Sequence, residues 1–509
     1  MTEEIPLDID GYASEYTGRT AITRLLAVSK YDSVAGSRLR ALLLAIRQVK
    51  AVTLDYELYG TLLEELRPYR TQNVGEAETG TLPRTLNDID VLEGMADLEA
   101  EVAGRIDEAW LATTAQQVKK QDDKLEAEMR NYSVNLIKES IRLTHHAQAT
   151  HARAHGDMEA ALKSYAQTKD FNSSARHDLE SSLGTIEVSL DIGAFAHTLP
   201  AVARAEYAIN RLITNSTSMA AGGVQISSSR DHPAIIMTGA QQRENERITG
   251  EMKEMSAITD TKLRVARGIV KVGQGSSQWA SAAREFGGIS GKLEDWEGTV
   301  VASGDIAVYA TLTSLATCNR STIKTLLLDN IQMRYFMDYG SAAYTRELVD
   351  CYMHARYQRL LEILRERKPR HLIDPFLRPV IAALEDHILQ NALVQYFQPY
   401  NSASFSRMLA SFGQEDENSR NDLAGKLAML IKTGRLQARL DLVEMAMHAT
   451  KPDPRQSLYT EALATGQKVQ SASRKAMLHM QLVESGLSLD GNKGQAKKKP
   501  GKKRGGQQN

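Results

Sequence analysis

The chain has 509 residues, more than one hydrophobic core usually supports, so we expect several domains or an elongated repeat array. Hydrophobic residues make up 42% and charged residues 25%, which excludes wholesale disorder. The 62 Lys and Arg balance the 63 Asp and Glu, so no net field favours nucleic acid or an acidic membrane surface as a partner.

The first residues and the cysteine content bear on the compartment. The opening MTEEIPLDID is acidic where a signal peptide would be basic and then apolar, and no apolar run approaches the length of a membrane span. Cys318 and Cys351 are the two cysteines, too few for a disulfide framework or a cysteine-built zinc site. We therefore expect an intracellular protein without a membrane partner.

Residues 1–130 are predicted to form an N-terminal helical region. Apolar residues at three- and four-residue spacing between Thr20 and Leu66 fit two amphipathic helices. Gly75, Gly80 and Pro83 stand among polar residues in 71–90, which predicts a loop before a further helix that contains Trp110.

Residues 131–370 are predicted to form an array of helical hairpins. Apolar stripes on either side of Gly156 and of Gly193 indicate two hairpins, and the pattern resumes from Ile258, breaking again at Gly273 and Gly275. The segments 160–165 and 281–286 share an order of small residues, a basic residue, a polar residue and an aromatic, as in tetratricopeptide repeats. Small residues let two helices approach, and the aromatic fills the gap to the next hairpin.

Between these hairpins, 213–250 is rich in Ser, Thr, Gly and Gln and lacks periodicity. It is predicted to be a surface insertion.

Residues 371–450 are predicted to form a winged-helix module. Three apolar stripes indicate helices through Leu389, through Phe405 and through Leu423, the last one opened by a capping box at Ser419–Asp422 and closed by Gly434. Alternating residues in 435–440 and 443–447 then predict a two-stranded wing that turns at Asp441 and Leu442. The predicted fold class is therefore all-α dominated: a tetratricopeptide-like solenoid, a winged helix and a C-terminal helix.

That C-terminal helix is predicted over 456–484. A seam of mostly small residues in four- and three-residue steps favours close packing in a helical bundle. Its interface candidates are Ala462, Gly466, Val469, Ala476, Met480 and Val483. Residues 485–509 contain almost nothing apolar and are predicted to be a disordered basic tail.

No catalytic, cofactor-binding or metal-binding residues are predicted. The best metal candidate is the set of four histidines His145, His146, His151 and His155. His151 and His155 share a helix face, but Ala152 stands where a zinc protease has its glutamate, and Arg153 would repel a cation. Gly273-Gln274-Gly275 and Ser290 lack the spacing of a nucleotide loop and of a nucleophile elbow. Packed or exposed histidines are the simpler interpretation.

The wing and the tail carry the remaining interaction candidates. Six basic residues between Ser402 and His448 are matched by six acidic ones, whereas phosphate binding needs a face of one sign. We therefore favour edge-to-edge protein association through the wing over nucleic acid, with Arg435, Arg439 and Asp441 as interface candidates. The tail is either a nuclear-import signal or a merely solvated segment, and its import candidates are Lys497, Lys498, Lys499, Lys502, Lys503 and Arg504.

Several motifs resemble the PCI-domain family, whose members are scaffold subunits of the proteasome lid, the signalosome and initiation factor three. The segments 135–142, 156–165, 169–171 and 392–400, with Ala438, Arg439 and Asp441, are similar to those of signalosome members. The resemblance covers most of Ala21 to Val483. The insertion 213–250 and the Lys-rich tail depart from the family pattern, so a family role for these two segments is not implied.

The resemblance implies a non-catalytic subunit of a complex that removes the ubiquitin-like modifier Nedd8 from cullins and so regulates cullin-RING ubiquitin ligases. The zinc isopeptidase centre would lie on another subunit. The implied partners are other PCI subunits, the isopeptidase subunits and cullin-RING ligases, and the implied location is the nucleus and cytoplasm. The alternatives are a proteasome-lid or initiation-factor-three PCI subunit, or a winged-helix nucleic-acid adaptor.

Overall fold

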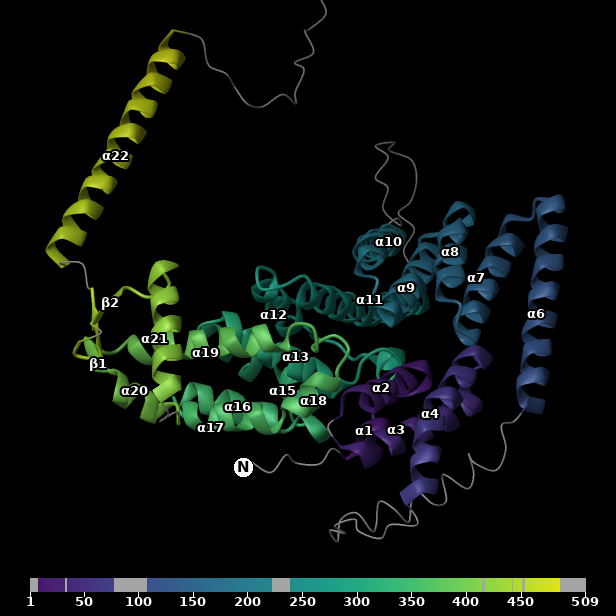
Figure 1. Cartoon of the computed structure of the whole chain (residues 1–509). Helices are drawn as coiled ribbons and strands as arrows, with labels where there is room; N and C mark the ends of the chain where they lie inside the picture. The colour runs from purple at the N-terminus through teal and green to yellow at the C-terminus, as the bar shows by residue number, and fades with distance from the viewer. Residues whose placement is uncertain are drawn as a thin grey trace, which may run out of the picture. The chain divides into compact units, whose positions relative to one another are not determined.

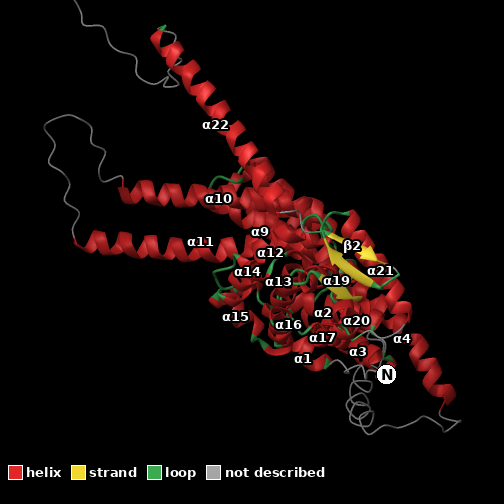
Figure 2. Ribbon diagram, turned by 90° about the vertical axis from the view of Figure 1, so that its left-hand side faces the viewer, coloured by secondary structure: helices red, strands yellow, loops and turns green. Residues whose placement is uncertain are grey.

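The computed structural model describes residues 8–32, 34–76, 108–221, 239–413, 417–441, 443–450 and 454–485. Helices make up almost all of this part of the chain (Figures 1 and 2). The chain divides into two compact units, one of Met1–Pro399 with Ser406–Lys426 and one of Tyr400–Phe405 with Leu427–Asn509. The predicted fold class is confirmed. None of the described helices is long and apolar enough to span a bilayer.

The N-terminal region begins with four helices, α1 (Ile9–Ser14), α2 (Gly18–Tyr31), α3 (Ala35–Val52) and α4 (Tyr56–Glu76). The prediction of two helices between Thr20 and Leu66 was wrong, because three helices, α2, α3 and α4, share that segment and α3 ends at Val52. Asp55 caps α4 by accepting a hydrogen bond from the Leu58 N–H at 2.9 Å. The first six residues of the predicted loop 71–90 lie in α4, and the rest of that loop lies outside the described residues.

The helical repeats follow the predicted order. They are α6 (Glu108–Asn135), α7 (Lys138–His155), α8 (Met158–Thr168), a 3₁₀ turn η1 (Lys169–Phe171), α9 (Ala175–Ile192), α10 (Phe195–Ala221), α11 (Gly239–Gly273) and α12 (Trp279–Gly287). Consecutive helices from α6 to α12 pack against each other. Gly156 ends α7 with φ of 104° and Gly193 ends α9 with φ of 76°, the left-handed conformation that a glycine adopts without strain.

The similar segments 160–165 in α8 and 281–286 in α12 both place an aromatic ring against a glycine of a neighbouring helix. A Cβ on Gly184 of α9 would lie 2.6 Å from the Tyr165 ring, and one on Gly268 of α11 would lie 2.5 Å from the Phe286 ring. Tyr165 therefore fills the gap to the next hairpin as predicted. Phe286 instead packs within its own hairpin, and its ring lies 6.0 Å from that of Tyr309 in the following helix.

Helices occupy both ends of the predicted surface insertion at 213–250. Helix α10 continues to Ala221 and α11 begins at Gly239, while 222–238 lies outside the described residues. The sequence of these helix ends lacks apolar periodicity. Residues such as Gln, Arg and Glu nevertheless extend a helix that is already nucleated at little cost.

A buried helix forms the centre of the larger unit. Helix α13 (Ser303–Thr317) is buried from Ser303 to Ala316 and packs against α12, α15, α16 and α19. The surrounding elements are η2 (Glu294–Trp296), α14 (Arg320–Ile323), a π-helical turn η3 (Lys324–Leu328), α15 (Ile331–Met337), η4 (Gly340–Ala342), α16 (Tyr344–Met353), α17 (Tyr357–Glu366), α18 (Lys368–Ile373) and α19 (Ile381–Phe397).

The winged-helix elements follow α19 in the order β1 (Ser402–Ser404), α20 (Phe405–Ser411), α21 (Glu417–Lys432), β2 (Ala438–Asp441) and β3 (Ala446–Ala449). The sheet is three-stranded and antiparallel in the order β1-β3-β2, so the predicted two-stranded wing lacked β1. Strand β1 has three residues, too few for an alternating pattern to stand out in the sequence, and they become a strand by pairing with β3. The predicted capping box was also wrong, since α21 begins at Glu417 and contains Ser419.

The chain's last described helix is α22 (Pro454–Glu484), close to its predicted bounds. The helix is exposed along almost its whole length, and Leu482 is its one half-buried described residue. A 31-residue helix with no core to bury against gains little from packing within this chain.

Candidate interaction surfaces

The wing candidates lie on and beside an edge strand. Arg439 is exposed on β2 opposite His448 of β3, and the neighbouring Ala438 is buried, as the alternation of a strand requires. Arg435 is exposed just before β2. Among the described strands β2 pairs with β3 alone, so its outer edge can accept a further strand.

Asp441 lies at the turn of the wing, as the alternating sequence predicted. Its carboxylate accepts hydrogen bonds from the N–H groups of Val443 at 2.9 Å and of Glu444 at 3.1 Å. These two bonds lower the pKa of Asp441 below its usual range. The side chain thus shapes the wing turn, at whose tip Val443 is 94% exposed. The carboxylate is held within the wing turn, and its role as an interface residue stays a prediction.

The predicted seam of α22 is exposed, and larger apolar residues widen it. Val469, Met480 and Val483 of the seam are 60%, 71% and 52% exposed. By helical spacing, Leu458 falls in line with these residues, and Tyr459 and Met477 flank the line. The small residues Ala462, Gly466 and Ala476 lie between them and are also exposed. A helix that exposes such a stripe in water is suited to burial against other helices.

The nuclear-import candidates Lys497 to Arg504 lie outside the described residues. The histidines of α7 do not form a metal-binding arrangement. The rings of His151 and His155 lie 5.1 Å apart, but His151 contacts Asp122 at 3.3 Å, and Arg153 between them pairs with Glu187 and Asp191. No group of three or more His, Cys, Asp or Glu side chains in the described ranges is arranged to hold a metal ion.

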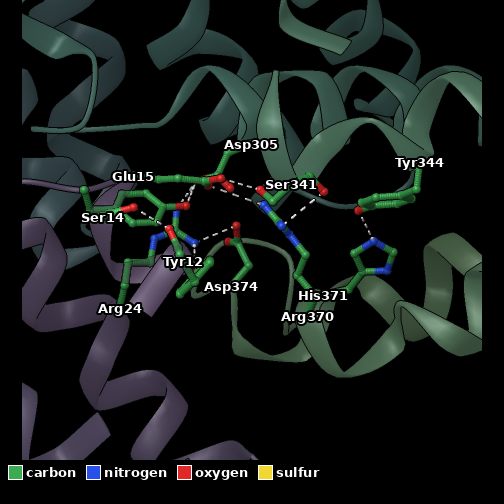
Figure 3. A network of polar contacts seen from close by, with 12 residues as sticks. Tyr12, Ser14, Glu15, Arg24, Asp305, Ser341, Tyr344, Arg370, His371 and Asp374 are labelled. Carbon is green, nitrogen blue, oxygen red and sulfur yellow. Dashed lines mark hydrogen bonds and ion pairs between the residues drawn. The ribbon is translucent and has the colours of Figure 1, made fainter. Parts of the chain in front are cut away.

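A buried ionic network, which the sequence analysis missed, joins the N-terminal helices to the centre of the larger unit (Figure 3). Arg24 of α2 contacts Asp305 of α13 at 2.8 Å and Asp374, just after α18, at 2.7 Å. All three side chains are almost completely buried. Tyr16 donates to Asp305 and Tyr309 donates to Asp374, each at 2.6 Å. Helix α2 and the segment that follows α18, almost 350 residues apart in the chain, are thereby joined through the Arg24 guanidinium.

The protonation states of this network follow from burial and from Arg24. Burial raises the pKa of Asp305, and Arg24 offsets part of that effect. Burial also acts to raise the pKa of Asp374, but Arg24 and hydrogen bonds from Tyr309 and the Phe376 N–H bring it below its ordinary value. The tyrosine hydroxyls keep their protons, because burial raises the pKa of Tyr16 and Tyr309 well above its usual value.

A second part of the network holds α1 against α18. Arg370 donates to the Ser341 carbonyl at 3.2 Å and lies 3.7 Å from Glu15, while the Ser341 hydroxyl donates to Glu15 at 2.5 Å (Figure 3). The only sequence signal for the whole network was one charged residue, Asp305, in the otherwise uncharged helix 303–317. The network joins the N-terminal helices to α13, to η4 and to the region of α18.

Helical repeats followed by a winged helix are an architecture of the PCI type, and two family models match these two parts of the chain. The PCI domain model matches residues 342–451, and the model described as 26S proteasome subunit RPN7 matches residues 107–326. The chain is therefore similar to PCI-domain proteins over residues 342–451.

Curated relatives narrow this class. COP9 signalosome complex subunit 1b of Drosophila melanogaster is 27% identical over 96% of this chain and 87% of its own length. Subunit 1 of the same complex from Arabidopsis thaliana is 27% identical over 94% of this chain and 90% of its own length. The 26S proteasome non-ATPase regulatory subunit 6 of Caenorhabditis elegans is 21% identical over 81% of this chain and 90% of its own length. The predicted resemblance is confirmed, and it is to subunit 1 of the COP9 signalosome.

Proposed function

We propose that this chain is a non-catalytic scaffold subunit of a signalosome, supporting removal of Nedd8 from cullins and so regulating cullin-RING ubiquitin ligases. The observation that carries the proposal is similarity over almost the whole chain to proteins named COP9 signalosome subunit 1. The zinc isopeptidase centre would be supplied by another subunit.

Two surfaces support an organising role. The outer edge of β2 is open to strand pairing among the described residues, which suits association with the wing of another PCI subunit. The apolar stripe of α22 is exposed in the isolated chain, which suits a bundle formed with helices of neighbouring subunits. The helical repeats would remain available to meet a cullin-RING ligase.

A variant pair tests the bundle. Gly466→Arg places a long cation on the seam, whereas Gln467→Arg places the same group about 100° away around the helix. Both positions are exposed, so neither change should alter the fold of the isolated chain. We expect Gly466→Arg to abolish co-purification with the other subunits and Gln467→Arg to preserve it. Equal recovery of the complex with both variants would contradict a role for the seam.

Loss of function gives the second test. Depletion of the chain should raise the Nedd8-modified fraction of cullins, which immunoblotting measures directly, and re-expression of the natural chain should reverse it. A proteasome-lid role is the second candidate, because one matching model is described as proteasome subunit RPN7. That role predicts accumulation of ubiquitin conjugates and proteasome subunits as co-purifying partners.

We further propose that the chain is found in the nucleus and the cytoplasm, with Lys497–Lys499 and Lys502–Arg504 acting as the import signal. Replacing these six residues by Gln in a fluorescent fusion should shift the protein toward the cytoplasm. An unchanged distribution would assign nuclear entry to the assembled complex instead.

A further inference from the structure

A hollow of about 350 Å³ lies on one face of the helical repeats. We call it the repeat groove. It is lined by Tyr165 of α8, Lys169 of η1, Asn172, four residues of α9 (Asp178, Ser181, Ser182 and Thr185) and three of α10 (Ala203, Arg204 and Tyr207). Ser181, Ser182 and Thr185 are buried, so the floor consists of small hydroxyl-bearing residues. The volume of the repeat groove is large enough to hold a few ligand groups and is larger than a packing defect.

Two buried polar atoms of the repeat groove lack partners among the described residues. The Asn172 side chain donates from Nδ2 to Asp178 at 3.0 Å and to Ser181 at 3.1 Å, while its Oδ1 is buried without a donor. This orientation is fixed, because the Asp178 carboxylate can only accept. On the opposite wall, the Arg204 Nε is buried without an acceptor. Each such atom costs free energy until a partner supplies the missing bond.

The charges of the repeat groove favour an anion. Asp178 is its one carboxylate, and it is already engaged by Asn172 and by Arg211 at 3.5 Å. Lys169 and Arg204 form no ion pair with a carboxylate in the described ranges. At the rim, Tyr207 is 67% exposed, so its flat apolar ring is accessible beside Lys169 and Arg204.

We propose that the repeat groove binds an extended acidic peptide segment of a partner protein. A carboxylate of the peptide accepts from the Arg204 guanidinium, a backbone N–H donates to Asn172 Oδ1, and a neighbouring apolar side chain packs on Tyr207. A peptide fits both walls because it carries backbone donors and an acidic acceptor within a few ångströms of each other. A free carboxylate ion could satisfy Arg204 but offers nothing to Asn172. The proposal does not depend on the identity of the complex.

The test uses the full chain and two matched sets of fluorescein-labelled octapeptides. One set carries Asp or Glu at the fourth position among Ala, Leu, Ser and Tyr, and the other carries Asn or Gln at that position. Fluorescence polarisation should show binding by members of the acidic set, with each matched amide at least about tenfold weaker, as expected for loss of a charge-assisted hydrogen bond.

Three variants connect that binding to the repeat groove. Arg204→Gln removes the cation, and Ala203→Trp fills the hollow from an exposed position without removing a polar group; each should weaken binding about tenfold or more. Arg130→Gln, on the exposed surface of α6, is the matched control and should bind like the natural chain. Circular dichroism verifies that all three variants keep their helical content. Acidic peptides held no more tightly than their amides or than acetate, or binding unchanged in Arg204→Gln or Ala203→Trp, would overturn the proposal.

Discussion

Arg24→Met tests whether the buried network fixes the N-terminal helices to the centre of the larger unit. The substitution keeps much of the side-chain volume but leaves Asp305 and Asp374 without the cation that lies 2.8 and 2.7 Å from them. Removing one partner of a buried ion pair costs about 3–5 kcal/mol, because the remaining charge is uncompensated. A cost of that size is a large part of the stability of a typical domain.

Urea unfolding followed by circular dichroism measures this cost as a shift in the midpoint. Arg346→Met is the matched control. Arg346 also contacts an aspartate, Asp338, at 2.7 Å, but both side chains of this pair are half exposed. Solvent screens an exposed pair, so the control should unfold almost like the natural chain. Limited proteolysis should release the N-terminal helices early in Arg24→Met alone.

A triple variant separates the charge from the contacts. Adding Asp305→Asn and Asp374→Asn to Arg24→Met removes the uncompensated charges, and we expect it to regain more than half of the lost stability. If Arg24→Met unfolds within about 1 kcal/mol of the control, or if the triple variant is the least stable of all, the network does not act as described.

Two further substitutions probe other buried features of the larger unit. Burial lowers the pKa of His371 to about 3, so the folded chain keeps this ring neutral while the unfolded chain protonates it below about 6.5. Stability is therefore present above that pH and lost as pH falls toward 3, by about 1.4 kcal/mol per unit from this residue. Unfolding midpoints at pH 7 and 5 should differ less in His371→Gln than in the exposed His354→Gln, and parallel profiles would contradict this cause. Gly156→Ala should destabilise the chain more than Gly193→Ala in thermal unfolding. Both glycines have positive φ, but an added Cβ at Gly156 meets the Asp55 carboxylate, whereas at Gly193 it meets nothing. Equal losses of stability would show that the Asp55 side chain moves aside without cost.

Helices with one apolar face and a glycine at the end were predictable from the sequence. The helices around Gly156 and Gly193 have both signals, and their positions agree with the structure. The ends of α10 and α11 were not predictable in this way, because their sequence shows no apolar stripe. Strand β1 was missed for a related reason, since three short residues become a strand only through their partner β3.

The line of exposed residues along α22 was predictable, because periodicity alone defines one face of a helix. The hydrogen bonds that Asp441 accepts within the wing turn were not, because a carboxylate that caps a turn and one that meets a partner look alike in sequence. The Arg24 network and the repeat groove were missed because both depend on residues far apart in the chain. Arg24 lies 281 positions from Asp305, and no local pattern pairs them.

Affinity purification of the tagged full-length chain, followed by native mass spectrometry, tests the proposed function most directly. The scaffold role predicts one defined complex containing this chain in stoichiometric amount, several other PCI subunits and a zinc isopeptidase, which removes Nedd8 from a modified cullin. Recovery of proteasome base subunits, or of a chain that remains alone at cellular concentrations, would contradict it.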